Sequence, residues 1–100
     1  MRRDDVVARL RIAEPSLRRC GVGALYLFGS HARDDAQNES DVDLFVDPVA
    51  DDQFGFLEFM GAYQAIQNAV GGDIAISYST RDGLSPYVRA EIEREALRIF

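Results

Sequence analysis

Residues 41 to 47 (DVDLFVD) constrain the fold more than any other segment, because polar and apolar side chains alternate along most of it. This alternation is typical of a half-buried β-strand, in which successive side chains point to opposite faces of a sheet. The apolar side chains would face a core, whereas Asp41 and Asp43 would share the other face. Pro48 follows directly and predicts the end of the strand.

The rest of the chain alternates between helical and strand patterns. The expected elements are a helix over residues 4 to 20 broken near Glu14 by Pro15, a strand over 24 to 28, a short helix over 31 to 36 capped by Ser30, a helix over 53 to 70, a strand over 73 to 78, and a last helix from Ser85-Pro86 to about Ile99. We therefore expect a mixed α/β (α+β) fold, with about three strands in a small mixed sheet and four or five helices. One hundred residues correspond to a single domain, residues 1–100.

Charge and composition exclude several classes of protein. The net charge is −6 and all 11 basic residues are Arg, so tight, sequence-independent nucleic-acid binding is not expected. No apolar run approaches the ~20 residues of a membrane span. The N-terminus lacks the apolar segment of a secretion signal. Cys20 is the single cysteine, which excludes a disulfide framework and indicates a small core side chain. We expect a cytoplasmic protein.

Gly29 and Ser30 stand between an apolar strand and a predicted helix. Glycine lets a phosphate approach the backbone closely, and the first turn of a helix offers free N–H groups. The Ser30 hydroxyl adds a donor. A Gly-Ser pair alone is also typical of an ordinary helix cap.

Asp41 and Asp43 strengthen the interpretation of Gly29 and Ser30 as a phosphate-binding turn. Residues i and i+2 of a strand point to the same face with Cα atoms roughly 6.5–7 Å apart. Two carboxylates so close repel each other unless a cation lies between them. Mg²⁺ prefers such oxygen ligands and completes its coordination with substrate phosphates. The alternative is two exposed aspartates on an edge strand.

Together these residues resemble a known family. Gly29-Ser30, ten residues, and then Asp41-x-Asp43 form the G-S-x10-D-x-D signature of the DNA polymerase β-like nucleotidyltransferase superfamily. The wider string LFGSHARDDAQNESDVDLFV resembles the minimal nucleotidyltransferase (MNT) pattern LFGSxARGxAxxxSDxDLxV. The closing LSPYVRAEIEREALRIF is also similar to the usual MNT ending. The resemblance implies a fold like the palm of polymerase β.

The resemblance also implies roles for single residues. Gly29 and Ser30 would bind the phosphates of ATP or another nucleoside triphosphate, and Asp41 and Asp43 would ligate one or two Mg²⁺ ions. Arg33 would help to place phosphate or lock the loop.

Two features of the loop remain open. Arg33 could instead form a salt bridge with Asp34, Asp35 or Glu39. Asp34 stands where the family usually has glycine, so the turn after Arg33 could differ.

The third carboxylate of the family falls on the next strand, where this sequence departs from the pattern. Asp73, Ala75 and Ser77 share one face of the strand predicted over residues 73 to 78, and Asp73 is the acidic one. We favour Asp73 as the third catalytic and metal-binding residue. If Ala75 or Ser77 takes that position, the metal site is incomplete.

The resemblance implies two functions. The first is transfer of a nucleotidyl group, AMP from ATP, to an acceptor that another protein supplies. MNT domains often act as antitoxins of HEPN proteins, which are small helical toxins, and the acceptor would then be a hydroxyl of such a partner. The alternative is a binding module that neutralises its partner by docking alone. Homo- or hetero-oligomers fit either function.

Three further predictions concern side chains outside the motif. We expect His31 to face solvent and Tyr87 to pack, with its hydroxyl within reach of the site as an alternative. The helix over residues 53 to 70 carries two apolar stripes, which are either core or a partner interface. Their members are Phe56, Phe59, Tyr63, Ile66 and Val70 in one and Phe54, Leu57, Gly61 and Ala65 in the other.

Overall fold

The structure is a computed structural model, and it describes residues 1–37 and 40–100. Its elements are α1 (Arg3–Ile12), α2 (Glu14–Arg19), β1 (Val22–Phe28), α3 (Gly29–Ala32), β2 (Val42–Pro48), the 3-10 turn η1 (Asp51–Gln53), α4 (Phe56–Val70), β3 (Ile76–Thr80), the 3-10 turn η2 (Arg81–Gly83), α5 (Arg89–Glu95) and β4 (Leu97–Arg98). None of the helices in these two ranges is long and apolar enough to cross a membrane.

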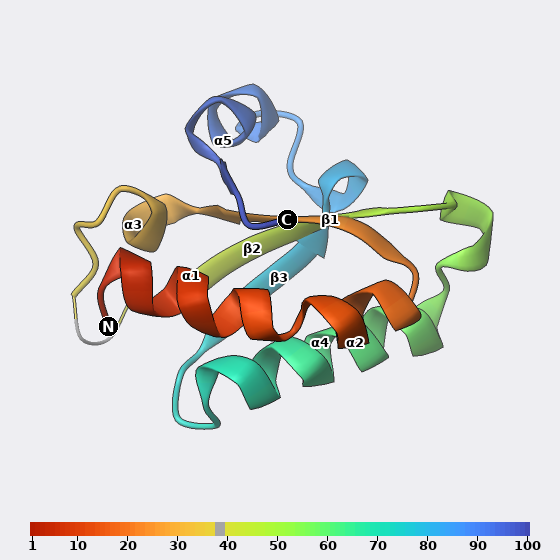
Figure 1. Cartoon of the computed structure of the whole chain (residues 1–100). Helices are drawn as coiled ribbons and strands as arrows, with labels where there is room; N and C mark the ends of the chain where they lie inside the picture. The colour runs from red at the N-terminus through yellow and green to blue at the C-terminus, as the bar shows by residue number, and fades with distance from the viewer. Residues whose placement is uncertain (38–39) are drawn as a thin grey trace.

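The strands form one mixed sheet in the order β3-β2-β1-β4. β1 pairs antiparallel with both β2 and β4, and β2 pairs parallel with β3 (Figure 1). The predicted mixed α/β fold is confirmed, although the described residues form a sheet of four strands where the sequence predicted about three.

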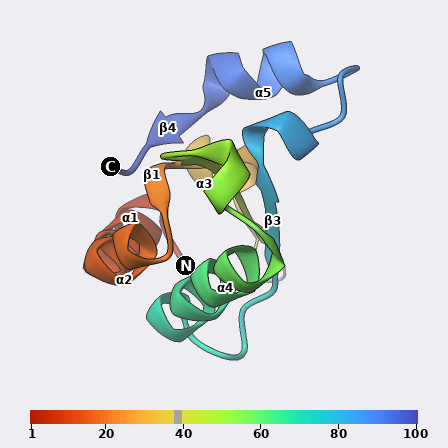
Figure 2. The same cartoon turned by 90° about the vertical axis from the view of Figure 1, so that its right-hand side faces the viewer.

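Helices α1, α2 and α4 cover one face of this sheet, and α5 lies on the opposite side (Figures 1 and 2). The core lies between the sheet and these three helices, because the apolar side of the β2 alternation points toward them. Its fully buried members include Leu25, Leu27, Val42, Leu44 and Val46 of the strands and Val6, Leu10, Leu17, Ala62, Ile66 and Val70 of the helices.

The opposite face of the sheet carries the polar side of the same alternation. Strand register sets Phe28 of β1 and Ser77 of β3 on either side of Asp43. Further along β2, the ring of Tyr26 stacks on Phe45 with ring centroids 4.7 Å apart. This face therefore presents an acidic residue near one end of β2 and an aromatic layer in its middle.

The end of the chain differs from the prediction of a helix up to Ile99. α5 ends at Glu95, and the chain then extends along β1, where Ile99 N donates to Leu25 O at 2.8 Å and Leu25 N donates to Phe100 O at 3.1 Å. This pairing satisfies backbone groups that β1 would otherwise leave open at its edge, and it buries the Ile99 side chain. Long-range pairing thus overrides the local helical spacing.

The break after α1 and the first residue of β3 can also be compared with the prediction. The predicted break near Glu14 is confirmed, since α1 ends at Ile12 and α2 carries Pro15 in its first turn. β3 begins at Ile76 rather than at Asp73, because Gly71 ends α4 with φ of +108° and the following residues turn before they pair.

Candidate functional site

The two halves of the sequence motif meet in the structure. Because Phe28 pairs with Asp43, Gly29 begins α3 directly beside that aspartate. Gly29 has φ of +74°, and a Cβ built on it would overlap Asp43 Oδ2 and lie 3.2 Å from Cγ. Glycine is thus required twice, for the left-handed backbone and for the close approach of a carboxylate. The acidic residue lies against the backbone of the glycine-serine turn.

Electrostatics at Asp43 favour a cation. Its side chain is half-buried, and burial raises the pKa of the carboxyl group. The neighbouring carboxylate of Asp41 raises it further, whereas His31 and Arg33 lower it. A divalent ion between the two acids would offset both the burial of Asp43 and its repulsion by Asp41, because the ion replaces lost hydration and neutralises negative charge.

His31 is buried, so the prediction that it faces solvent is wrong. The residue is 3% exposed, and its Nδ1 lies 3.0 Å from the backbone oxygen of Asp41. A carbonyl oxygen only accepts, so Nδ1 must carry the proton and donate. The ring therefore ties α3 to the residue that begins the acidic pair. No local spacing in the sequence marks this role.

Arg33 forms ion pairs on two sides. Its Nε donates to Asp35 Oδ2 at 3.2 Å, and Nη1 donates to Glu95 Oε2 at 3.0 Å. These hydrogen bonds, led by that to Glu95, raise the pKa of the guanidinium. The alternative of a loop salt bridge is confirmed for Asp35, while the pair with Glu39 lies outside the described residues.

Glu95 was not recognised as a site residue from the sequence. Its second oxygen, Oε1, accepts a hydrogen bond of 3.1 Å from Gly29 N. One carboxylate from the end of α5 therefore holds both the backbone of the glycine-serine turn and Arg33.

Asp34 keeps the backbone shape that glycine would adopt. It has φ of +61°, the one positive value at a non-glycine residue in the described part of the chain. Aspartate tolerates this left-handed region better than most residues, and Asp34 Oδ1 also accepts from Arg3 N at 3.1 Å. Asp34 thus adopts a left-handed backbone conformation that glycine would also adopt.

Strand register decides which residue lies beside the acidic pair. Ser77 of β3 is the partner of Asp43, whereas Asp73 is exposed in the turn before the strand. Val42 N donates to Ala75 O, so Ala75 precedes the position in question. Within residues 1–37 and 40–100, no three His, Cys, Asp or Glu side chains come close enough to hold a metal together. Of the three alternatives, the structure places Ser77 beside the pair, and Asp73 does not reach it.

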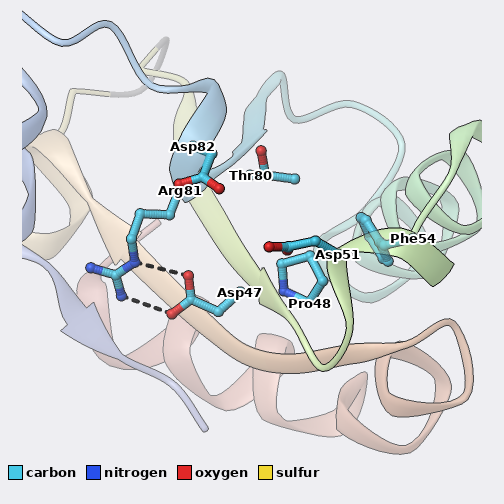
Figure 3. Close-up of a pocket in the computed structure, with 7 residues that line it drawn as sticks. All are labelled: Asp47, Pro48, Asp51, Phe54, Thr80, Arg81 and Asp82. Carbon is cyan, nitrogen blue, oxygen red and sulfur yellow. Dashed lines mark hydrogen bonds and ion pairs between the residues drawn. The ribbon is translucent and has the colours of Figure 1, made fainter.

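A hollow of about 420 Å³ lies at the other end of β2 (Figure 3). Arg81 holds Asp47 there through two hydrogen bonds of 2.8 Å. Its guanidinium also lies about 5 Å from the ring centroids of Tyr26 and Phe45. Because acidic residues line the hollow and hold its arginine, it suits a triphosphate poorly. We therefore locate the candidate site by its chemistry, at Asp43 and Gly29.

The predictions for the Tyr87 and Cys20 side chains differ in their agreement with the structure. Tyr87 is 96% exposed, so the prediction that it packs is wrong. Cys20 is partly buried and packs against the core, as expected for a small apolar side chain.

The sheet and the acidic pair beside a glycine-serine turn define a domain of the nucleotidyltransferase type. The family model described as Polymerase beta, Nucleotidyltransferase matches residues 12–100, so the chain belongs to this family.

Two solved structures resemble the chain. One protein, provisionally described as a minimal nucleotidyltransferase, is 27% identical over 97% of this chain and 95% of its own, with a TM-score of 0.80. The second, from a toxin-antitoxin structure with AMP-PNP, is 16% identical over 100% of this chain and 73% of its own, with a TM-score of 0.64. This second likeness concerns the fold alone. A search of curated proteins finds no match.

Proposed function

We propose that the domain binds a nucleoside triphosphate with Mg²⁺ and transfers its nucleotidyl group, AMP from ATP, to a hydroxyl group of a partner protein. The observation that carries this proposal is the contact between Asp43 and the backbone of Gly29. A metal held by the acid and a phosphate held by the turn would be direct neighbours. A cytoplasmic location, where both ATP and Mg²⁺ are available, accompanies the proposal.

The acidic pair fits a magnesium ion. Mg²⁺ is usually bound by one or two carboxylates together with substrate phosphates, and Asp41 and Asp43 supply that number. Burial and then the charge of Asp41 raise the pKa of Asp43, so a bound cation would stabilise its ionised form. Bound here, the ion would supply charge neutralisation at the α-phosphate of the transferred nucleotidyl group. Ser77 offers a hydroxyl where a third acid would lie, so the set supports one ion better than two.

The chain's own residues would bind and orient the substrate. The N–H groups of the turn and the Ser30 hydroxyl would donate to phosphate oxygens, and Arg33 lies close enough to add a charged donor. In the reaction the acceptor oxygen bonds to the α-phosphorus and the bond to the β-phosphate oxygen breaks. Pyrophosphate leaves, and the hydroxyl proton passes to solvent. Positioning and charge compensation would provide most of the rate.

The acceptor is proposed to belong to a small helical protein of the HEPN type. The toxin-antitoxin description of the second solved structure supports a protein partner, as does the family resemblance. This part of the proposal concerns the identity of the partner and can fail separately from nucleotide transfer.

Label transfer tests the enzymatic proposal. The domain is incubated with ATP labelled at the α-phosphate, Mg²⁺ and the candidate partner, and label on the partner is measured. We expect Asp41→Asn and Asp43→Asn to abolish transfer. Asp52→Asn is the matched control, because Asp52 is exposed and lies in the η1 turn away from the pair. Equal labelling by all four proteins would refute the assignment of the pair.

A second function, neutralisation by docking alone, is favoured by two observations. Ser77, the β3 neighbour of Asp43, carries no carboxylate. In addition, most of the two α4 stripes pack inward, but Phe56 and Leu57 are 75% and 78% exposed, and Met60 lies exposed one turn later. These three residues form an apolar surface at the start of α4 that a helical partner could cover.

Co-purification separates docking from catalysis. If docking suffices, the partner is retained and neutralised by Asp43→Asn, whereas Phe56→Ser with Leu57→Ser releases it. Gln64→Ser on the exposed side of the same helix provides the control. Transfer without stable retention would instead indicate that chemistry is the function.

A further inference from the structure

Glu95 occupies two donors that the proposed function assigns to phosphate. Its Oε1 accepts from Gly29 N at 3.1 Å, and its Oε2 accepts from Arg33 Nη1 at 3.0 Å. Each contact uses one of the two oxygens of the same carboxylate, which is the arrangement expected for a bound anion. The side chain is 28% exposed, so it lies between the solvent and the turn.

The same carboxylate also lies near Asp43. Gly29, whose N–H donates to Glu95 Oε1, is the residue on which an added Cβ would overlap Asp43 Oδ2, so both carboxylates approach the same turn. A triphosphate entering this site would bring still more negative charge, and it would meet donors that already have an anionic partner.

We propose that Glu95 is an internal competitor of the nucleotide, one that holds Gly29 and Arg33 until phosphate oxygens replace its own. This inference rests on the proposed nucleotide site. Release is structurally simple, because Glu95 is the last residue of α5 and the chain continues into β4, whose pairing with β1 does not depend on the Glu95 side chain. The affinity for a triphosphate is then lower than it would be if Glu95 did not occupy Gly29 N and Arg33.

The test measures binding to the full chain by isothermal titration calorimetry. The probes are a nonhydrolysable ATP analogue with Mg²⁺ and, separately, adenosine, which lacks phosphate. Glu95→Gln keeps the size of the side chain but cannot hold the guanidinium as an ion pair. We expect the analogue to bind about tenfold more tightly to this variant, equivalent to about 1.4 kcal/mol, with no change for adenosine. Glu91→Gln removes the same charge from the same exposed helix and is expected to leave both affinities unchanged.

A second variant guards against a loss of structure. Glu95→Asp retains the charge but is one methylene shorter, so it cannot reach both Gly29 N and Arg33, and we expect a smaller gain in affinity. Thermal unfolding of each variant verifies that it is folded.

The outcomes are distinguishable. Unchanged or weaker binding of the analogue to Glu95→Gln, with clear binding to the original protein, overturns this inference and leaves the proposed function intact. Equal tightening for adenosine also overturns it, since that would indicate a general loosening of the site. If no variant binds the analogue, the proposed function fails together with the inference.

Discussion

Replacing Gly29 by alanine tests the contact on which the site depends. Two costs follow from the structure. The left-handed backbone at φ of +74° costs an L-residue about 1–2 kcal/mol. The new Cβ would overlap Asp43 Oδ2, so the carboxylate must rotate from its present position, which adds about 0.5–1.5 kcal/mol for an off-rotamer side chain. We expect Gly29→Ala to lower the free energy of unfolding by about 1.5–3.5 kcal/mol, the sum of these two costs.

A double-mutant cycle separates the two costs. Asp43→Ala removes the carboxylate, leaving only Asp43 Cβ at an ordinary 3.4 Å from the added atom. In that background Gly29→Ala should cost only the backbone term, so the coupling energy should be about 1 kcal/mol. Urea unfolding in the presence of EDTA, followed by circular dichroism, measures all four proteins without a contribution from bound metal.

Gly72 provides the matched control for this cycle. It has no positive φ, and an added Cβ would meet nothing within 4 Å. Gly72→Ala should therefore change stability by less than about 0.5 kcal/mol. The reasoning is refuted if Gly29→Ala costs no more than Gly72→Ala, or if its cost is the same with and without the Asp43 carboxylate.

Three further substitutions probe the site and the hollow at the other end of β2. Because the folded pKa of Asp43 lies above its ordinary value of 3.8, ionisation destabilises the fold as pH rises past that value. Asp43→Asn should therefore match the original protein at pH 3 and exceed it at pH 7 in thermal unfolding with EDTA. Arg81→Lys keeps the charge but loses the two-point contact with Asp47, and should cost about 1–3 kcal/mol in urea unfolding, whereas Arg94→Lys on α5 should not. His31→Ala should cost about 1–3 kcal/mol by leaving the Asp41 carbonyl unpaired, and a smaller loss would contradict the buried hydrogen bond.

Local patterns were sufficient for β1 and β2 and for the break between α1 and α2. Each of these elements has a short apolar or alternating run with a glycine or proline at its boundary, so its signal is complete within a few residues. The meeting of Gly29 with Asp43 followed from the same patterns together with the family motif.

Contacts between distant segments could not be predicted in this way. Glu95 lies 66 residues from Gly29 in the chain and 62 from Arg33, so no local spacing relates it to either residue. β4 was not predicted for the same reason. The helical spacing of apolar residues continues through Ala96, but the chain leaves the helix there and pairs with the open edge of β1. The position of Ser77 depended on where β3 begins, which the turn after Gly71 decides.

The balance of charge around Asp43 connects these long-range contacts to function. A carboxylate at position 77 would be the β3 neighbour of Asp43 and would add repulsion to a group whose pKa burial already raises. Serine at position 77 adds no such repulsion. Glu95 does bring a negative charge from α5, but Arg33 and the N–H of Gly29 compensate that charge by hydrogen bonding to its carboxylate. An acid from α5, not from the sheet, thus accepts the hydrogen bonds of Gly29 N and Arg33, the groups proposed to bind phosphate. Metal and nucleotide binding should therefore be coupled, because moving Glu95 away from Gly29 changes the charge that both ligands encounter.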